Sequence, residues 1–215
     1  MGALLRRNDR IEWSVGFVIV LLIAGQWWIS AKLGLDPGWV LPLLVAVCAL
    51  GSWLAAYAQW PNPRADHVLG YALVGVLAFG TVLSTLVFAT RVFLGSTLSP
   101  PELVLTGAVL WSQSVGVFGL AYWEVDGKGP TQRAISGPAE RTQDLMFPQQ
   151  QPEVEPTWAP TFGDYLYVSL TNATAFSPTD TMPMTHLAKF VMGVQSVTSA
   201  TILVVLVARA VNIAK

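Results

Sequence analysis

Charged residues are scarce in this chain of 215 residues. Aspartate, glutamate, lysine and arginine make up 12% of it, against 53% in the apolar class. A soluble globular domain carries about 25% charged residues, so this composition excludes an ordinary soluble protein. The charges also gather between long uncharged runs, which is typical of a chain that crosses a lipid bilayer.

Several kinds of functional residue are missing as well. Cys48 is the single cysteine, so the chain forms no internal disulfide, and its place in an apolar run predicts a packing role. His67 and His186 are far apart and have no metal-ligating neighbours in the sequence. No phosphate-binding glycine loop or Cys-x-x-Cys pair occurs, and the net charge of −1 provides no basic patch. The sequence therefore predicts neither an enzyme nor a nucleic-acid-binding protein, and it predicts no cofactor or metal site.

Five uncharged stretches are long enough to cross a bilayer, which takes about 20 residues in a helix. They are residues 13–31, 37–63, 67–90, 103–123 and 190–208. The first also fits a signal peptide, but Gln26, Trp27 and Trp28 stand where a small-residue cleavage site belongs. The short connections between the first four stretches predict antiparallel neighbours. No stretch carries the repeated arginines of a voltage sensor.

The composition changes after the fourth stretch. Residues 124–163 are rich in proline, glycine and charge, so we expect a water-exposed, partly irregular loop. Residues 165–179 then form an uncharged stretch between Asp164 and Asp180 that is too short to span. Its position between two spanning helices favours a re-entrant segment. Its hydroxyl-rich second half predicts irregular backbone, which survives at membrane depth only when it is buried in protein or lines water.

Residues 163–185, GDYLYVSLTNATAFSPTDTMPMT, resemble the pore helix, selectivity filter and outer mouth of the potassium-channel superfamily. The matching positions are Ser169 on the pore-helix serine, Ala173 and Thr174 on the Ala-Thr that ends this helix, Asp180 on the aspartate that closes the filter, and Pro183 and Thr185 on the Pro-x-Thr that leads into the inner helix. A few bacterial multi-pass membrane proteins carry a segment similar to NATAFSPTDT.

This resemblance implies an all-α membrane protein with about five transmembrane helices and one re-entrant pore helix. Residues 1–98 would hold three N-terminal transmembrane helices, and residues 99–215 a pore module. The module would comprise an outer helix at 103–123, the exposed loop 124–163, a pore helix and filter-like segment at 164–180, and an inner helix at 187–213. We expect Asp164 to be the N-cap of the pore helix.

The filter-like segment comprises Thr174, Ala175, Phe176, Ser177, Pro178, Thr179 and Asp180. Ser177 and Thr179 replace the glycines of the family's TVGYGD filter, and Pro178 fixes φ near −65°. Because glycine adopts positive φ readily and other residues only at a cost, the usual ladder of carbonyls cannot form. Potassium selectivity therefore does not follow from the resemblance.

The side chains of the filter-like segment have two interpretations each. The hydroxyls of Thr174, Ser177 and Thr179 either line an ion pathway or cap the pore helix and hold the turn. Asp180 either attracts cations at the outer mouth or bonds to the pore helix. The alternation of an extended strand predicts that Phe176 packs back against the pore helix.

Polar side chains also occur within the expected spanning helices. Gln195, Thr198, Ser199 and Ile202 share one face of the inner helix by their spacing. Such a face either lines a cavity or bonds to a neighbouring helix, and the resemblance favours the cavity. Gln113 in the outer helix is expected to join two helices.

Together these features predict a pore-loop cation channel for small inorganic ions, embedded in the lipid bilayer of a bacterial plasma membrane. We expect a homotetramer, because one chain carries one pore module and four modules close a pathway. The alternatives are a non-conducting membrane scaffold with a channel-derived fold, and a carrier or accessory subunit. Sidedness stays open, because an outward-facing filter puts Arg6, Arg7 and Arg10 outside, against the positive-inside rule.

Overall fold

The computed structural model describes residues 2–35, 37–57, 63–95, 98–136, 143–150, 158–176 and 180–213. Its long helices are α1 (Gly2–Lys32), α2 (Val40–Tyr57), α3 (Pro63–Phe93), α4 (Pro100–Val125) and α7 (His186–Ile213), and a shorter helix is α6 (Phe162–Ala175). The small elements are the 3-10 turn η1 (Asp126–Lys128), helix α5 (Pro130–Ser136), strand β1 (Leu145–Met146), the 3-10 turn η2 (Pro148–Gln150) and strand β2 (Met182–Pro183). The protein is therefore mostly helical, as the sequence predicts.

Four stretches of helix are long and apolar enough to cross a membrane. They are Ser14–Lys32, Val68–Phe93, Pro100–Lys128 and His186–Arg209. Each lies over one of the uncharged runs, which confirms that the chain is built as an α-helical membrane protein. The remaining run, residues 37–63, contains the 18-residue helix α2, but residues 58–62 lie outside the described residues. The count of five transmembrane helices therefore stays a prediction.

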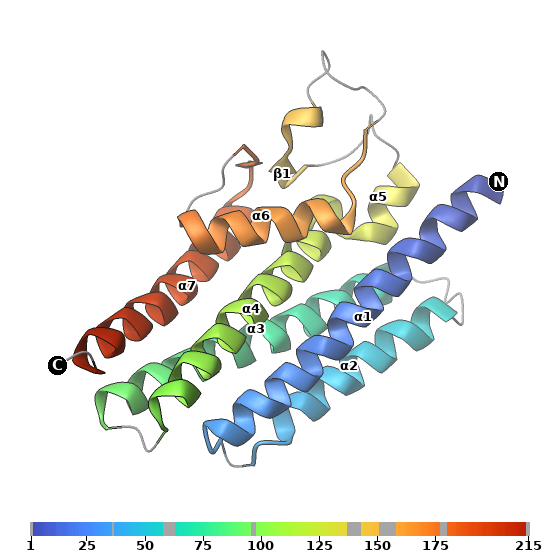
Figure 1. The fold of residues 1–215 in the computed structure, drawn as a ribbon. Coiled ribbons are helices and arrows are strands. Elements are labelled where there is room, and N and C mark those ends of the chain that lie inside the picture. Colours follow the sequence, from blue (N-terminus) through green and yellow to red (C-terminus); the bar gives the residue numbers. More distant parts are fainter. Residues whose placement is uncertain are drawn as a thin grey trace.

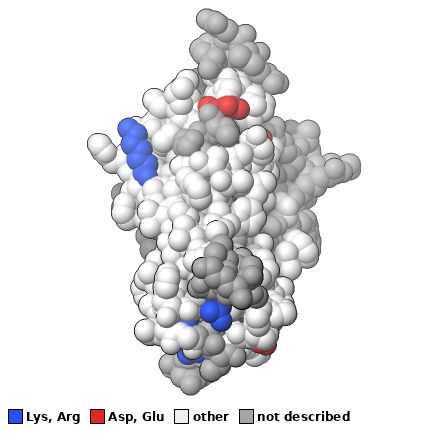
Figure 2. Space-filling view, turned by 60° about the vertical axis from the view of Figure 1, so that its left-hand side comes forward, with Lys and Arg blue, Asp and Glu red and all other residues white. Residues whose placement is uncertain are grey.

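The outer surface of the bundle is apolar. Phe17, Trp27, Phe79 and Val197 are all more than 60% exposed. Figure 2 shows a broad face without charged residues between charges near its two ends. Buried positions, by contrast, include polar residues such as Gln26, which is 1% exposed. An exterior of this kind suits hydrocarbon, where interior polar groups must find partners within the protein.

Helix α4 lies at the centre of the packing and contacts α1, α3, α6 and α7. Figure 1 shows the long helices running side by side, whereas α6 lies obliquely across α4 and α7. Two glycines allow these contacts to be close. A Cβ atom on Gly107 would lie 2.5 Å from Leu206 on α7, and one on Gly119 would lie 2.7 Å from Leu166 on α6. Small residues thus let neighbouring backbones approach, as is usual between membrane helices.

One end of the bundle carries a folded cap rather than the irregular loop expected for residues 124–163. Strand β1 pairs antiparallel with β2, with Leu145 opposite Pro183. Asp126, Arg133 and Phe147 are all at most 5% exposed. The described part of residues 124–163 is therefore more ordered and more buried than expected. The physical reason is that Asp126 and Arg133 find buried polar partners.

Candidate functional site

The candidate site is built around α6, which begins at the capped end of the bundle. The backbone N–H and the hydroxyl of Thr161 both donate to Asp164 Oδ2, at 2.7 Å each. This is a capping box in which Thr161 is the N-cap and Asp164 the third helical residue. The N-cap is therefore Thr161 and not Asp164 as expected, because the helix begins three residues earlier and Asp164 completes the cap from its third position.

A buried carboxylate anchors the start of α6. Tyr165 Oη donates to Asp126 Oδ2 at 2.6 Å, while Asp126 Oδ1 accepts from the backbone N–H groups of Asp144 and Leu145 at 2.9 and 3.0 Å. Trp123 packs edge-on against Tyr165, with ring centroids 5.4 Å apart. These contacts join the end of α4, the strand β1 and the first turn of α6 into one unit.

Arg133 completes this unit from the other side. Its guanidinium lies over the ring of Trp123, 4.4 Å from the centroid, and donates to the carbonyl of Trp123 at 2.6 Å and to that of Asp126. Sequence reasoning did not identify this buried charge, because its partners are backbone carbonyls and an aromatic face.

From this end, α6 descends into the bundle without crossing it. Ser169 Oγ donates to the carbonyl of Val115 at 2.7 Å. Val115 lies ten residues before Val125, where α4 ends, so the contact is about 15 Å below that end at 1.5 Å per residue. At 14 residues α6 is too short to span.

The chain after α6 returns to the end from which it came. Met184 N donates to the carbonyl of Asp144 at 2.8 Å, and Thr185 Oγ1 donates to Asp144 Oδ1 at 2.7 Å. Asp144 Oδ2 also accepts from the backbone N–H of Gly127, at 3.0 Å. The segment that precedes α6 and the segment that follows it therefore meet at one end of the bundle.

Four side chains at this depth form a network that joins α4, α6 and α7. Asn172 Nδ2 donates to Gln195 Oε1 at 2.9 Å and to Tyr122 Oη at 3.2 Å, and Tyr122 Oη in turn donates to Gln195 Oε1. Gln195 Nε2 donates to Ser169 Oγ at 2.7 Å and to the Ser169 carbonyl at 2.9 Å. We call these residues the amide network. All four are at most 1% exposed.

The inner-helix face is buried inside the chain instead of lining a cavity. Gln195, Thr198, Ser199 and Ile202 are all at most 5% exposed. Gln195 belongs to the amide network, Thr198 Oγ1 donates to the Val194 carbonyl at 2.7 Å, and Ile202 packs in an apolar cluster with residues of α1, α3 and α4. The spacing correctly placed them on one face, but this face is buried within the chain, where the Ser199 hydroxyl has no hydrogen-bond partner.

The filter-like residues that the structure describes are exposed. Thr174, Ala175, Phe176 and Asp180 all belong to the exposed class, with Phe176 46% exposed. Thr174 Oγ1 donates to the Leu170 carbonyl at 2.6 Å, so its hydroxyl is bonded within α6. Ser177, Pro178 and Thr179 lie outside the described residues.

Phe176, which we expected to pack back against this helix, is about half-exposed. It is the C-cap of α6 and adopts the left-handed conformation, with φ of 56°. Left-handed backbone is uncommon for a residue with a side chain and costs free energy.

Sequence reasoning missed Tyr122 and Asn172 as members of a buried network. The signal was present, because each interrupts an apolar run with a polar group. Gln113 is confirmed as a link between helices, since Gln113 Nε2 donates to Gln26 Oε1 at 2.6 Å, and Gln26 Nε2 donates to Ser84 Oγ at 3.1 Å. This second polar layer joins α1, α3 and α4.

Within the described part of the chain, no three His, Cys, Asp or Glu side chains gather closely enough to hold a metal ion. Instead, α6 is a short helix whose C-terminal end is exposed, and strand β2, which follows it in the chain, lies at the capped end of the bundle. Comparison with known proteins adds nothing to this geometry: no protein-family model, no curated protein and no solved structure matches the chain.

Proposed function

We propose that this chain is a subunit of an oligomeric pore-loop channel for small cations, with four copies around one axis. The observation that carries the proposal is the exposed C-terminal end of α6 at depth within the bundle. Thr174, Ala175 and Phe176 are exposed there, although Asn172 and Ala173 next to them are buried. If hydrocarbon surrounded this helix end, each unpaired carbonyl would cost a free energy on the order of several kcal/mol. Further copies that enclose water at this end remove that cost.

The depth of this end fits a short pathway. Asn172 Nδ2 donates to the carbonyl of Met192 at 3.1 Å, and Met192 lies six residues into α7, about 9 Å along its axis. The chain must return from Phe176 to Met182 in strand β2, and these six steps span at most about 20 Å.

The dipole at the C-terminal end of α6 supports a cation as the permeating ion. The C-terminal end of an α-helix carries about half a negative charge from its aligned peptide dipoles, and the last turn of α6 holds no basic residue that would neutralise it. Four such ends around one axis would favour cations. Asp180, which is exposed, adds a carboxylate at the return.

The proposed architecture has five crossing helices and α6 as the re-entrant helix. It is supported by the packing of α2 against α1 and α3 and by the start of α1 and the end of α7 lying at opposite ends of the bundle (Figure 1). An odd number of crossings produces this placement.

The test combines flux with cross-linking. Purified protein in liposomes should carry a cation flux, and in a Cys48→Ala background Thr174→Cys or Asp180→Cys should cross-link copy to copy and make the flux sensitive to a thiol reagent. Val20→Cys on α1, whose native residue is 63% exposed, is the matched control and should do neither. Flux that ignores reagents at positions 174 and 180, without cross-links, would refute a pathway at α6.

A non-conducting scaffold is the second candidate, and one observation favours it. The face of α7 that would line a channel cavity is buried by contacts within the chain. A scaffold predicts no flux from protein whose fold is intact by circular dichroism, whether or not positions 174 and 180 cross-link.

A further inference from the structure

At the opposite end of the bundle from the cap, a cavity of about 210 Å³ opens between α3 and α7. Val92, Phe93, Gly95, Val205, Ala208 and Arg209 line it. Two membrane-spanning stretches, Val68–Phe93 and His186–Arg209, end at its walls. We therefore expect the cavity to lie at the boundary between the hydrocarbon and the headgroups.

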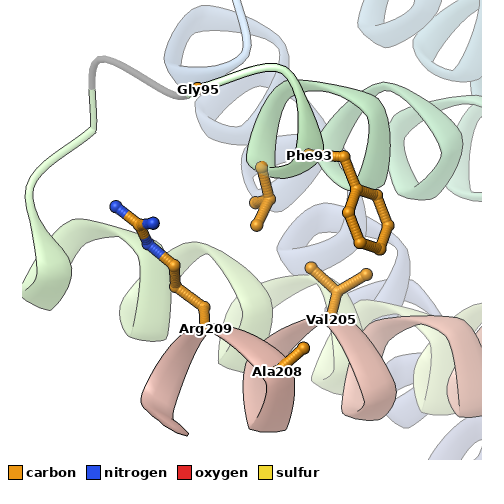
Figure 3. A pocket seen from close by; sticks show the side chains of 6 residues that line it. Phe93, Gly95, Val205, Ala208 and Arg209 are labelled. Carbon is orange, nitrogen blue, oxygen red and sulfur yellow. The ribbon is translucent and has the colours of Figure 1, made fainter. Parts of the chain in front are cut away.

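The cavity combines an apolar wall with one cationic group. Figure 3 shows the Arg209 side chain extending away from Phe93, Val205 and Ala208, so that its guanidinium stands at one side of the cavity. The surrounding surface is apolar too, since Phe93 is 71% and Leu94 87% exposed. An occupant that suits both parts has a hydrocarbon tail and an anionic head.

Arg209 lacks an anion from the described part of the chain. Its Nε atom is buried without a hydrogen-bond acceptor. Glu102, a carboxylate at the same end, is bound by Lys32 Nζ at 2.9 Å and by the N–H and hydroxyl of Ser99, at 3.0 and 2.8 Å. Because Nε is enclosed by the protein, an external acceptor can reach this guanidinium only through its terminal amino groups. The planar guanidinium matches a phosphate with two parallel hydrogen bonds.

We propose that this cavity binds an anionic phospholipid, with its phosphate on Arg209 and an acyl chain against Val205 and Phe93. An anionic lipid is favoured over a zwitterionic one because Lys32, Arg91 and Arg209 outnumber Glu102 among the described charges at this end. A choline headgroup would bring a further cation into this field. The site does not depend on whether α6 forms a pore.

Native mass spectrometry of the full chain in detergent tests the proposal, with phosphatidylglycerol and phosphatidylcholine titrated separately. The chain should bind phosphatidylglycerol in preference. Arg209→Gln should weaken that binding about fivefold, the factor expected when one basic side chain near an anionic headgroup is lost. Arg91→Gln is the matched control, because it removes the same charge at the same end but outside the cavity lining. It should weaken phosphatidylglycerol binding less than Arg209→Gln does, because Arg91 contributes to the field at this end but does not contact the bound headgroup.

A second variant keeps the test decisive if Arg209→Gln fails to fold. Ala208→Phe fills the cavity and retains the charge, so it should weaken the binding of both lipids. Inorganic phosphate at millimolar concentration should not compete, because it has no acyl chain. The proposal is overturned if Arg209→Gln and Arg91→Gln reduce phosphatidylglycerol binding equally, if Ala208→Phe has no effect, or if phosphate displaces the lipid.

Discussion

Replacing Gln195 by methionine removes the centre of the amide network while nearly conserving the volume of the side chain. The wild-type amide makes four hydrogen bonds, two donated by Nε2 to Ser169 and two accepted by Oε1, from Tyr122 and Asn172. Interhelical hydrogen bonds in membrane proteins average about 0.6 kcal/mol each, so their loss should cost about 2.4 kcal/mol. The buried hydroxyl of Tyr122, which is 1% exposed, would lose its hydrogen-bond acceptor, and this adds to the cost.

Thr198→Val on the same face of α7 is the matched control. It too exchanges a buried polar group for an apolar one of similar shape, but the lost bond is to Val194 within the same helix. We expect less than about 0.5 kcal/mol, because no bond between helices is broken. Equilibrium unfolding in mixed micelles with a denaturing detergent, followed by tryptophan fluorescence, measures both variants. Equal unfolding free energies for Gln195→Met and Thr198→Val would refute the structural role of the network.

Three further predictions use the same protein. Gly119→Val should destabilise the fold by about 1–3 kcal/mol in the micelle assay, because the new side chain meets Leu166. Gly193→Ala should be nearly neutral, because nothing lies within 4 Å of the added Cβ. The reverse order of stability would contradict the packing of α4 on α6. Asp126→Asn should speed limited proteolysis of the cap. An amide oxygen accepts hydrogen bonds less strongly than a carboxylate does, and Asp126 accepts from Asp144 N–H, Leu145 N–H and Tyr165 Oη. An unchanged cleavage rate would count against this anchor. Bi-ionic reversal potentials should show little preference for potassium over sodium, because Ser177 and Thr179 replace the filter glycines; strong potassium selectivity would show that this reasoning is wrong.

Properties that depend on local sequence could be predicted. Hydropathy is local, so the uncharged runs located four helices long enough to span. The uncharged stretch between Asp164 and Asp180 contains most of a 14-residue helix that is too short to span. The common face of Gln195, Thr198 and Ser199 also followed from the 3.6-residue period alone.

Properties that depend on distant partners could not be predicted. Periodicity tells which residues share a side of a helix, but the neighbour of that side is set by the packing of α4 and α6 against α7. The burial of Asp126 depends in the same way on Tyr165, which is 39 positions away. The left-handed φ of Phe176 is likewise not encoded by any pattern of aromatic residues.

The position of α6 between two partners has a consequence for biosynthesis. Its polar side chains bond backward to Val115 in α4 and forward to Met192 in α7. A helix of this length cannot be inserted as a span of its own, and half of its acceptors are still inside the ribosome when it emerges. We therefore expect α6 to enter the membrane only after α7 has been synthesised, so that the last step of assembly is the docking of a segment from the middle of the chain.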